Sequence, residues 1–240
     1  MKYKTLLATA VISFLGVGAA QAGPYSTHSA RGHVGENNIL RIQISSLTPR
    51  GDRTYWHDKQ LDFTGGPNDL QDAAVTFDYQ RHLTGRLALM VSATAFQGNT
   101  DQSYIRYTDS LGNDITHTTT LERSDLTVGL VFFPIGRDAV LVPYVGAGLG
   151  AYGWRLQESG DFINFNTDPA YVFSDRFTAD GNAFGHYWLA GLEVPLGWNW
   201  ALFAEGRWQR ADDQLNRDFA TFGTLDLSSK QVGVGMSWSF

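Results

Sequence analysis

The chain has 240 residues, a formal net charge of −6 and no cysteine. The missing cysteine excludes disulfides and thiolate metal sites, and the acidic balance argues against nucleic acid as a partner. Beyond the N-terminus, no apolar run approaches the roughly 18 residues of a membrane-spanning helix, so a helical membrane protein is excluded. The 26 glycines, the 13% of aromatic residues and the lack of helical periodicity favour one all-β domain.

The N-terminus has the features of a secretory signal peptide. Lys2 and Lys4 form a basic start, residues 6–19 form an apolar run, and Ala20-Gln21-Ala22 provides a small-residue cleavage site. The sequence therefore predicts a signal peptide over residues 1–22 and a single mature domain over residues 23–240. Removal of the two lysines changes the formal charge from −6 to −8.

In chain order, eight segments alternate apolar residues with small or polar ones at the period of two that is typical of strands. They are residues 39–45, 73–81, 86–97, 124–134, 140–154, 184–195, 200–210 and 227–240. Short turns follow the second, fourth and sixth of them. Long polar segments follow the first, third, fifth and seventh, at residues 46–72, 98–123, 155–183 and 211–224.

The last of the eight alternating segments, residues 227–240, indicates that the strands lie in a membrane. Its large side chains share one face, and the opposite face is small and nearly uncharged; the large ones are Val232, Val234, Met236, Trp238 and Phe240. An open apolar edge strand would invite aggregation, whereas closure into a membrane barrel pairs the edge and places the apolar face in lipid. A terminal Phe240 also resembles the signal that the barrel-assembly machinery recognises, so we expect that machinery as a partner.

These patterns predict an all-β fold, an eight-stranded antiparallel transmembrane β-barrel with short periplasmic turns and four long outer loops. A soluble lipocalin-like barrel would bury its aromatic residues and carry charges outside, and this chain does the reverse. Outward aromatics near strand ends suit interfacial girdles; they are Tyr79, Phe132, Trp198, Trp200, Trp208, Trp238 and Phe240. We therefore expect localisation in the bacterial outer membrane, with its lipid and lipopolysaccharide as partners.

Three stretches carry a family resemblance: NNILRIQISSLTPRG, AAVTFDYQRHLTGRLALMVSATAF and LTVGLVFFPIGRDAVLVPYVGAGLGAY. Together with the aromatic terminal strand, they resemble the OmpW-like small outer-membrane barrels, and more broadly the OmpA- and OmpX-like ones. The resemblance covers most of the barrel but not its loops. It implies the barrel fold and a narrow hydrophobic channel for small apolar compounds.

The alternation predicts two interior zones. A charged zone lies in the middle or toward the periplasmic half: Arg41, Asp78, Glu193, Glu205 and Arg207. An apolar lining lies from the midplane toward the outer end: Met90, Phe96, Tyr152, Tyr187 and Leu189. The charges are either a salt-bridge network that plugs the barrel, which we favour, or a gate beneath a pocket. The expected function is a narrow channel or binding pocket for small apolar molecules; the alternative is a closed barrel that acts through its acidic outer loops.

The four long segments carry eight basic and seventeen acidic residues. These charges either keep the loops solvated or bridge through Ca²⁺ or Mg²⁺ to lipopolysaccharide phosphates. The densest acidic group is Asp212, Asp213 and Asp218, without EF-hand spacing. We therefore predict no cofactor and no resident metal; His57 and His117 also lie in these segments without metal-ligand spacing.

Lipid A deacylation is the enzymatic alternative, because small outer-membrane barrels include such enzymes. A deacylase needs a serine activated by a histidine, and His186 is the one histidine well inside a predicted strand. Phe184 and Trp188 flank it, and no His-x-Ser pattern occurs; the nearest approach is His28-Ser29, before the barrel. The sequence therefore predicts no catalytic residues and an ordinary interfacial role for His186.

Overall fold

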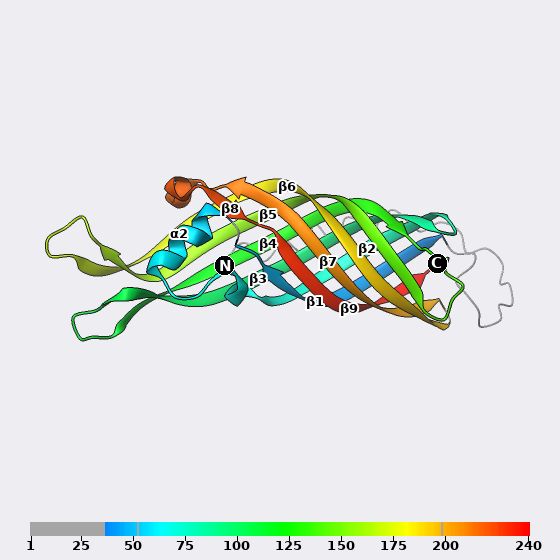
Figure 1. Ribbon diagram of the computed structural model, residues 1–240, viewed down its shortest axis with the longest axis horizontal. Coiled ribbons are helices and arrows are strands. Elements are labelled where there is room, and N and C mark those ends of the chain that lie inside the picture. The colour runs from blue at the N-terminus through cyan, green and yellow to red at the C-terminus, as the bar shows by residue number, and fades with distance from the viewer. Residues whose placement is uncertain (1–36, 52, 198) are drawn as a thin grey trace. The chain divides into compact units, whose positions relative to one another are not determined.

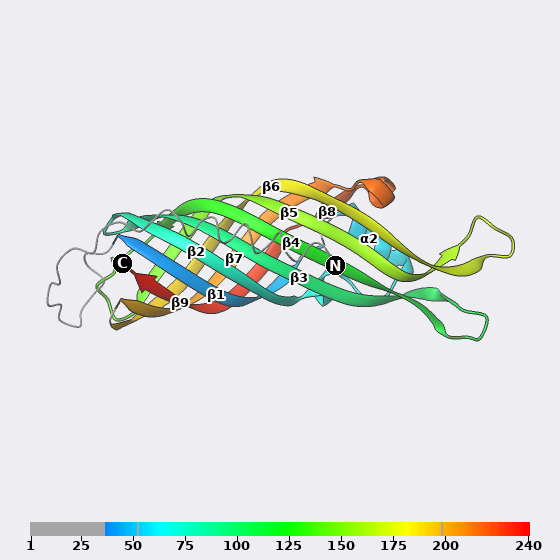
Figure 2. The ribbon, with the colours of Figure 1, turned by 180° about the vertical axis from the view of Figure 1, so that it is seen from behind.

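The computed structural model describes residues 37–51, 53–197 and 199–240, and the predicted signal peptide lies outside these ranges. Eight strands form the wall of a barrel (Figures 1 and 2). They are β1 (Asn38–Pro49), β2 (Asp72–Thr84), β3 (Leu87–Thr108), β4 (Asp114–Phe132), β5 (Val142–Asn164), β6 (Tyr171–Gly197), β7 (Trp200–Gln214) and β9 (Ser229–Ser239).

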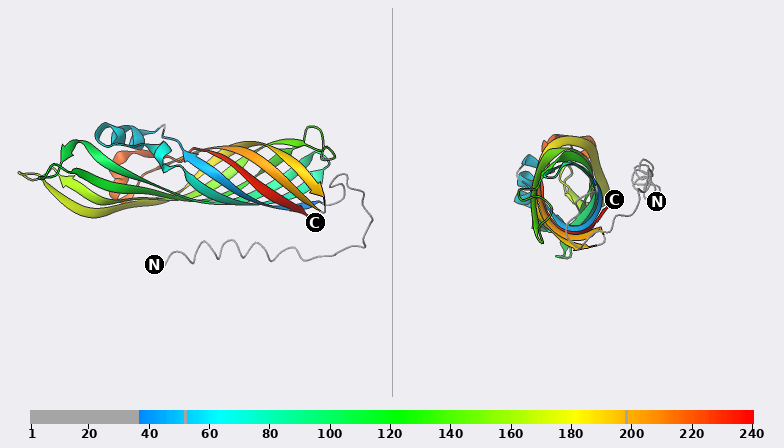
Figure 3. Two further views of the ribbon diagram at one scale, coloured as in Figure 1. Left: turned by 90° about the horizontal axis from the view of Figure 1, so that it is seen from below. Right: turned by 90° about the vertical axis from the view of Figure 1, so that its right-hand side faces the viewer.

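The sheet closes on itself. Each strand from β1 to β7 pairs antiparallel with the next, and β9 pairs with both β7 and β1. The amide of Phe240 donates to the carbonyl oxygen of Asn38 at 2.9 Å, so the last residue continues the seam. The view along the axis shows a closed ring (Figure 3, right). The predicted all-β, eight-stranded antiparallel barrel is confirmed.

The period of two decides which side chains face outward. In β4, Leu126, Val128 and Leu130 are about half exposed, whereas Asp125 and Thr127, which alternate with them, are buried. The same alternation along the other strands makes an apolar belt around the barrel, as a lipid-facing surface requires. At the end that carries the short turns, Trp238 contacts Trp200 and stacks on Phe240, as predicted for a girdle; Trp198 lies outside the described residues.

Several strands extend much farther than predicted. Strand β3 continues to Thr108, β4 begins at Asp114, β5 runs to Asn164 and β6 begins at Tyr171. Most of the predicted long segments 98–123 and 155–183 are therefore paired β-structure with short connections. The predicted strands are too short because their bounds rest on the apolar alternation. This alternation stops where the outward side chains leave the apolar belt, although the backbone pairing continues.

We call the two ends of the barrel the turn end, which carries the short turns, and the loop end. At the loop end, β3–β6 rise above the other strands, and two connections cover the side that this leaves open (Figure 1). The first contains helix α2 (Thr54–Asp62) and the 3₁₀ turn η1 (Pro67–Leu70); the other contains η2 (Arg217–Phe222) and β8 (Thr224–Asp226). No helix among the described residues is long and apolar enough to cross a membrane.

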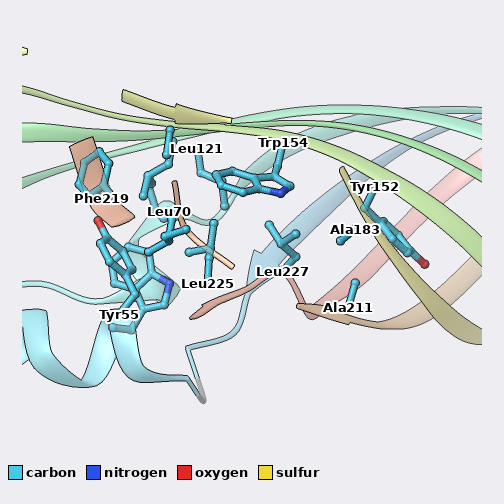
Figure 4. Close-up of a cluster of buried hydrophobic side chains, with 14 residues drawn as sticks. Tyr55, Leu70, Leu121, Tyr152, Trp154, Ala183, Ala211, Phe219, Leu225 and Leu227 are labelled. Atoms are coloured by element: carbon cyan, nitrogen blue, oxygen red, sulfur yellow. The ribbon is translucent and has the colours of Figure 1, made fainter. Parts of the chain in front are cut away.

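An apolar cluster fills the barrel beneath these covering segments (Figure 4). Tyr55 and Trp56 of α2 are each 1% exposed and pack with Phe219 of η2. Wall residues complete the cluster, among them Leu121, Tyr152, Trp154, Leu156 and Leu227. Burial of these large side chains holds both connections against the wall.

Candidate functional site

A charged network crosses the interior of the barrel at mid-height. The Glu205 carboxylate accepts from Arg41 Nη2 at 3.0 Å and from Arg207 Nη2 at 2.9 Å. Arg207 also lies 3.4 Å from Asp78, and Arg41 Nε lies 3.9 Å from the same carboxylate. Two cations and two anions therefore balance within one buried group, which compensates part of the cost of removing them from water.

Neutral side chains complete this network. The hydroxyl of Tyr144 accepts from Arg41 at 2.6 Å and donates to Glu205 at 3.0 Å. The Arg41 guanidinium also lies 3.7 Å from the ring centre of Phe203. These residues come from β1, β2, β5 and β7, so the contacts join opposite parts of the wall. Four of the five charged residues of the predicted zone meet here; Glu193 is buried but forms no ion pair with another described residue.

The five residues of the predicted apolar lining are buried but do not lie together. Met90, Tyr187 and Leu189 belong to a cluster that also contains Ala88 and Phe133, beside the short turns. Phe96 packs with Leu47 and Ala74 instead, and Tyr152 belongs to the cluster beneath α2. The single apolar zone expected on the outer side of the charges is therefore divided among three clusters. None of the ten predicted interior residues is more than 5% exposed.

A second polar network, missed in the sequence, lies nearer the loop end. Arg123 contacts Asp125 at 2.9 Å and donates to Gln209, Ser229 and the carbonyl oxygen of Leu227 at 2.9–3.1 Å. The alternation of β4 could have found it. This alternation places Asp125 inward within the predicted strand 124–134, and it places Arg123 inward when it is extended by one residue.

A third cluster lies above the belt, between α2 and the tall strands. Lys59 of α2 donates to the Glu158 carboxylate of β5 and to Thr119 at 3.3 Å. The Tyr55 hydroxyl donates to the same carboxylate, and His117 Nε2 faces it at 3.8 Å. Lys59 and Glu158 are both 6% exposed and His117 is 2% exposed. The helix is thus held by a buried ion pair as well as by its aromatic residues.

Burial dominates the electrostatics of this third cluster. Burial, the largest cause, and the nearby Lys59 ammonium together lower the pKa of His117 to about 4, against the opposing effect of Glu158. Burial also lowers the pKa of Lys59, against the opposing effect of Glu158. At neutral pH the imidazole is therefore uncharged, and Glu158 has one close cationic partner.

The remaining candidates stay apart from one another. His186 faces outward, stacks on Trp188 with ring centres 5.8 Å apart, and lies opposite Leu149 and Arg210 in the sheet. Asp213 accepts from the Trp154 indole at 2.8 Å, and Asp218 accepts from a backbone amide at 2.7 Å. Within the described ranges, no three His, Asp or Glu side chains are grouped to hold a metal ion.

Comparison with known proteins identifies the fold class. The chain is similar to the outer-membrane protein OprG from Pseudomonas aeruginosa, at 13% identity over 88% of this chain and 99% of that one, with a TM-score of 0.50. The chain has the fold of bacterial outer-membrane barrels. No family model and no curated protein sequence matches it.

Two other solved barrels are similar at lower scores. Neisserial surface protein A is 11% identical over 85% of this chain and 97% of that one, with a TM-score of 0.48. The outer-membrane protease OmpT from Escherichia coli is 10% identical over 90% of this chain and all of that one, with a TM-score of 0.47. In bacterial outer-membrane barrels the short turns face the periplasm and the long loops face outside. The narrower resemblance to OmpW-like barrels stays a prediction.

Proposed function

We propose that this chain is a closed, non-catalytic outer-membrane barrel that works through the surface of its loop end. The observation that carries this proposal is the interior packing, because the mid-height charge network joins β1 and β2 to β5 and β7. An eight-stranded barrel has little room beyond its own side chains. A water-filled path would leave side chains along it exposed, and the ten interior residues are buried.

The structure of the loop end supports a role in surface interaction. The first and last connections are fixed against the wall by the aromatic cluster and by the Lys59–Glu158 pair. Ordered connections present a defined surface to a partner without the entropic cost of ordering a loop on binding. The acidic excess of these segments favours a cationic partner.

The second candidate is the narrow channel or binding pocket for small apolar molecules. Its support is that Met90, Tyr187 and Leu189 pack together beside the charge network. This function requires the charge network to move. Arg41 and Arg207 would otherwise block a molecule passing between the apolar cluster and the loop end.

Single-channel recording in planar bilayers separates the two. We expect the mature wild-type protein to show no discrete openings. The double variant Arg41→Ala/Arg207→Ala should conduct, because it removes two long side chains from mid-height. Arg106→Ala is the matched control, as this arginine is exposed and pairs with Asp62 outside the barrel. Wild-type openings that a long-chain detergent blocks would contradict the closed barrel and support the apolar channel.

A further inference from the structure

A groove of about 850 Å³ runs across the lipid-facing side of the barrel. Ten of its lining residues face outward, from β1, β5, β6, β7 and β9. They are Ile44, Ser46, Pro143, Val145, Ala190, Leu192, Ala204, Gly206, Val232 and Val234. Its floor is low because Ala190, Ala204 and Gly206 are small. Its volume lies within the roughly 300–1,000 Å³ of small-molecule sites, and its lining is almost wholly apolar.

A row of large side chains borders the groove toward the loop end. Trp188 lies opposite Trp208, and Trp208 lies opposite Lys230. Each is two residues along its strand from a groove residue, so it shares the same outward face. Tryptophan and lysine at this position are typical of the boundary between the apolar belt and the lipid headgroups.

One row farther toward the loop end, His186 lies opposite Arg210. Directly opposed side chains on one face lie about 4.5–5.5 Å apart, and diagonal ones about 7–8 Å apart. Arg210 and Lys230 are therefore diagonal neighbours, both beside Trp208. One phosphate group can lie between two cations at this spacing.

The charges around this pair leave it available to an anion. Arg210 and Lys230 are exposed, and neither forms an ion pair with another described residue. The next outward residue of β7 toward the loop end, Asp212, is paired with Arg53 at 3.5 Å. The cluster is thus a positive patch on a chain whose formal net charge is −6.

We propose that the groove and the Arg210–Lys230 pair form one binding site for a phosphorylated lipid of the outer leaflet. An acyl chain lies in the apolar groove, and the headgroup phosphate lies between the two cations. Arginine and lysine bind phosphate through charge-assisted hydrogen bonds. Trp188, Trp208 and His186 flank the headgroup, where amphipathic rings are stable. The site is independent of whether the interior conducts.

The test measures lipid retention on the purified barrel. Wild type and variants are reconstituted into phosphatidylcholine vesicles that contain diphosphorylated lipid A, extracted, and analysed by native mass spectrometry. We expect wild type to retain lipid A, and Arg210→Gln/Lys230→Gln to lower retention on the order of thirtyfold, since each of the two basic residues near a membrane surface contributes about 1 kcal/mol. Ala204→Leu, which fills the groove without changing charge, should also lower retention severalfold.

Matched controls separate the site from general effects. Arg106→Gln/Arg176→Gln removes two exposed cations from the hairpins beyond the belt, and Ala93→Leu adds the same bulk on β3, outside the groove. Both should retain lipid A as wild type does, and far-UV circular dichroism should show every variant folded. Dephosphorylated lipid A should be retained several times less than the diphosphorylated form. Equal retention of the two lipids, or wild-type retention by either site variant, would overturn the proposal.

Discussion

Glu205 is the carboxylate that lies nearer to both arginines of the mid-height network, and its replacement by glutamine isolates its contribution. The glutamate accepts from Arg41, Arg207 and Tyr144. Glutamine has the same shape but one acceptor oxygen, and its amide group would face a donor. Two buried guanidinium groups would then share only Asp78, whose oxygens are 3.4 and 3.9 Å from them.

The expected cost follows from that loss. Removal of one partner from a buried ion pair costs about 3–5 kcal/mol, because a charge stays in the interior without compensation. We expect Glu205→Gln to lower the free energy of unfolding by about this amount. The assay is urea unfolding of the barrel in detergent micelles, followed by tryptophan fluorescence and extrapolated linearly to zero denaturant.

Glu193→Gln is the matched control for this prediction. Glu193 is buried to a similar extent on the neighbouring strand, yet it forms no ion pair with another described residue. Loss of its charge should cost less than loss of the Glu205 charge, because Glu193 acts on Arg41 only at longer range and forms no ion pair, and a buried charge without a close partner is itself unfavourable. If both variants lose the same stability, the charge network does not hold the barrel together and the reasoning is refuted.

Two further predictions concern other parts of the barrel. Because His117 has a pKa of about 4 when folded and 6.5 as a free side chain, the unfolded form binds the proton more readily. The loop end should therefore become less stable as pH falls from 6.5 toward 4. The variant His117→Gln should reduce this pH dependence. Hydrogen exchange of the α2 amides at several pH values measures the stability of the loop end. Gly148→Val should destabilise the barrel by about 1–3 kcal/mol, since a Cβ at this position would lie 2.2 Å from the Val128 carbonyl oxygen and 2.7 Å from the Tyr187 ring. In the same unfolding assay Gly85→Ala, where nothing lies within 4 Å, should behave as wild type. A stable Gly148→Val variant would contradict this prediction, because both the β4 backbone and the Tyr187 ring would then have to move aside.

The sequence predicts the wall of the barrel well because the period of two is set by backbone geometry. It places Arg41, Asp78, Glu205 and Arg207 inside, as the structure does. It cannot give their level along the axis, since that depends on the stagger between tilted strands. This is why the five predicted lining residues are divided among three clusters.

The loop end was harder to predict for a different reason. Helix α2 has no side-chain N-cap, and it buries Tyr55, Trp56 and Lys59 against other segments. Lys59 and Glu158 are 99 positions apart in the chain, so no local pattern relates them. Their contact results from packing, and in the sequence each has the appearance of an ordinary loop charge.

The strands of the barrel differ in length, and this decides how far each hairpin extends beyond the apolar belt at the loop end. Strand β5 continues for 13 residues past Ala151, the last small apolar residue of its belt. At about 3.3 Å per residue and a tilt of about 40°, that is a rise of roughly 30 Å. The β3–β4 and β5–β6 hairpins therefore extend beyond α2 and η2 (Figure 1), and the rings of Tyr107 and Phe165, with centres 5.1 Å apart, bring the two hairpins into contact. A partner that approaches the barrel along its axis from the loop end would therefore meet these two hairpins before it reaches α2 or η2.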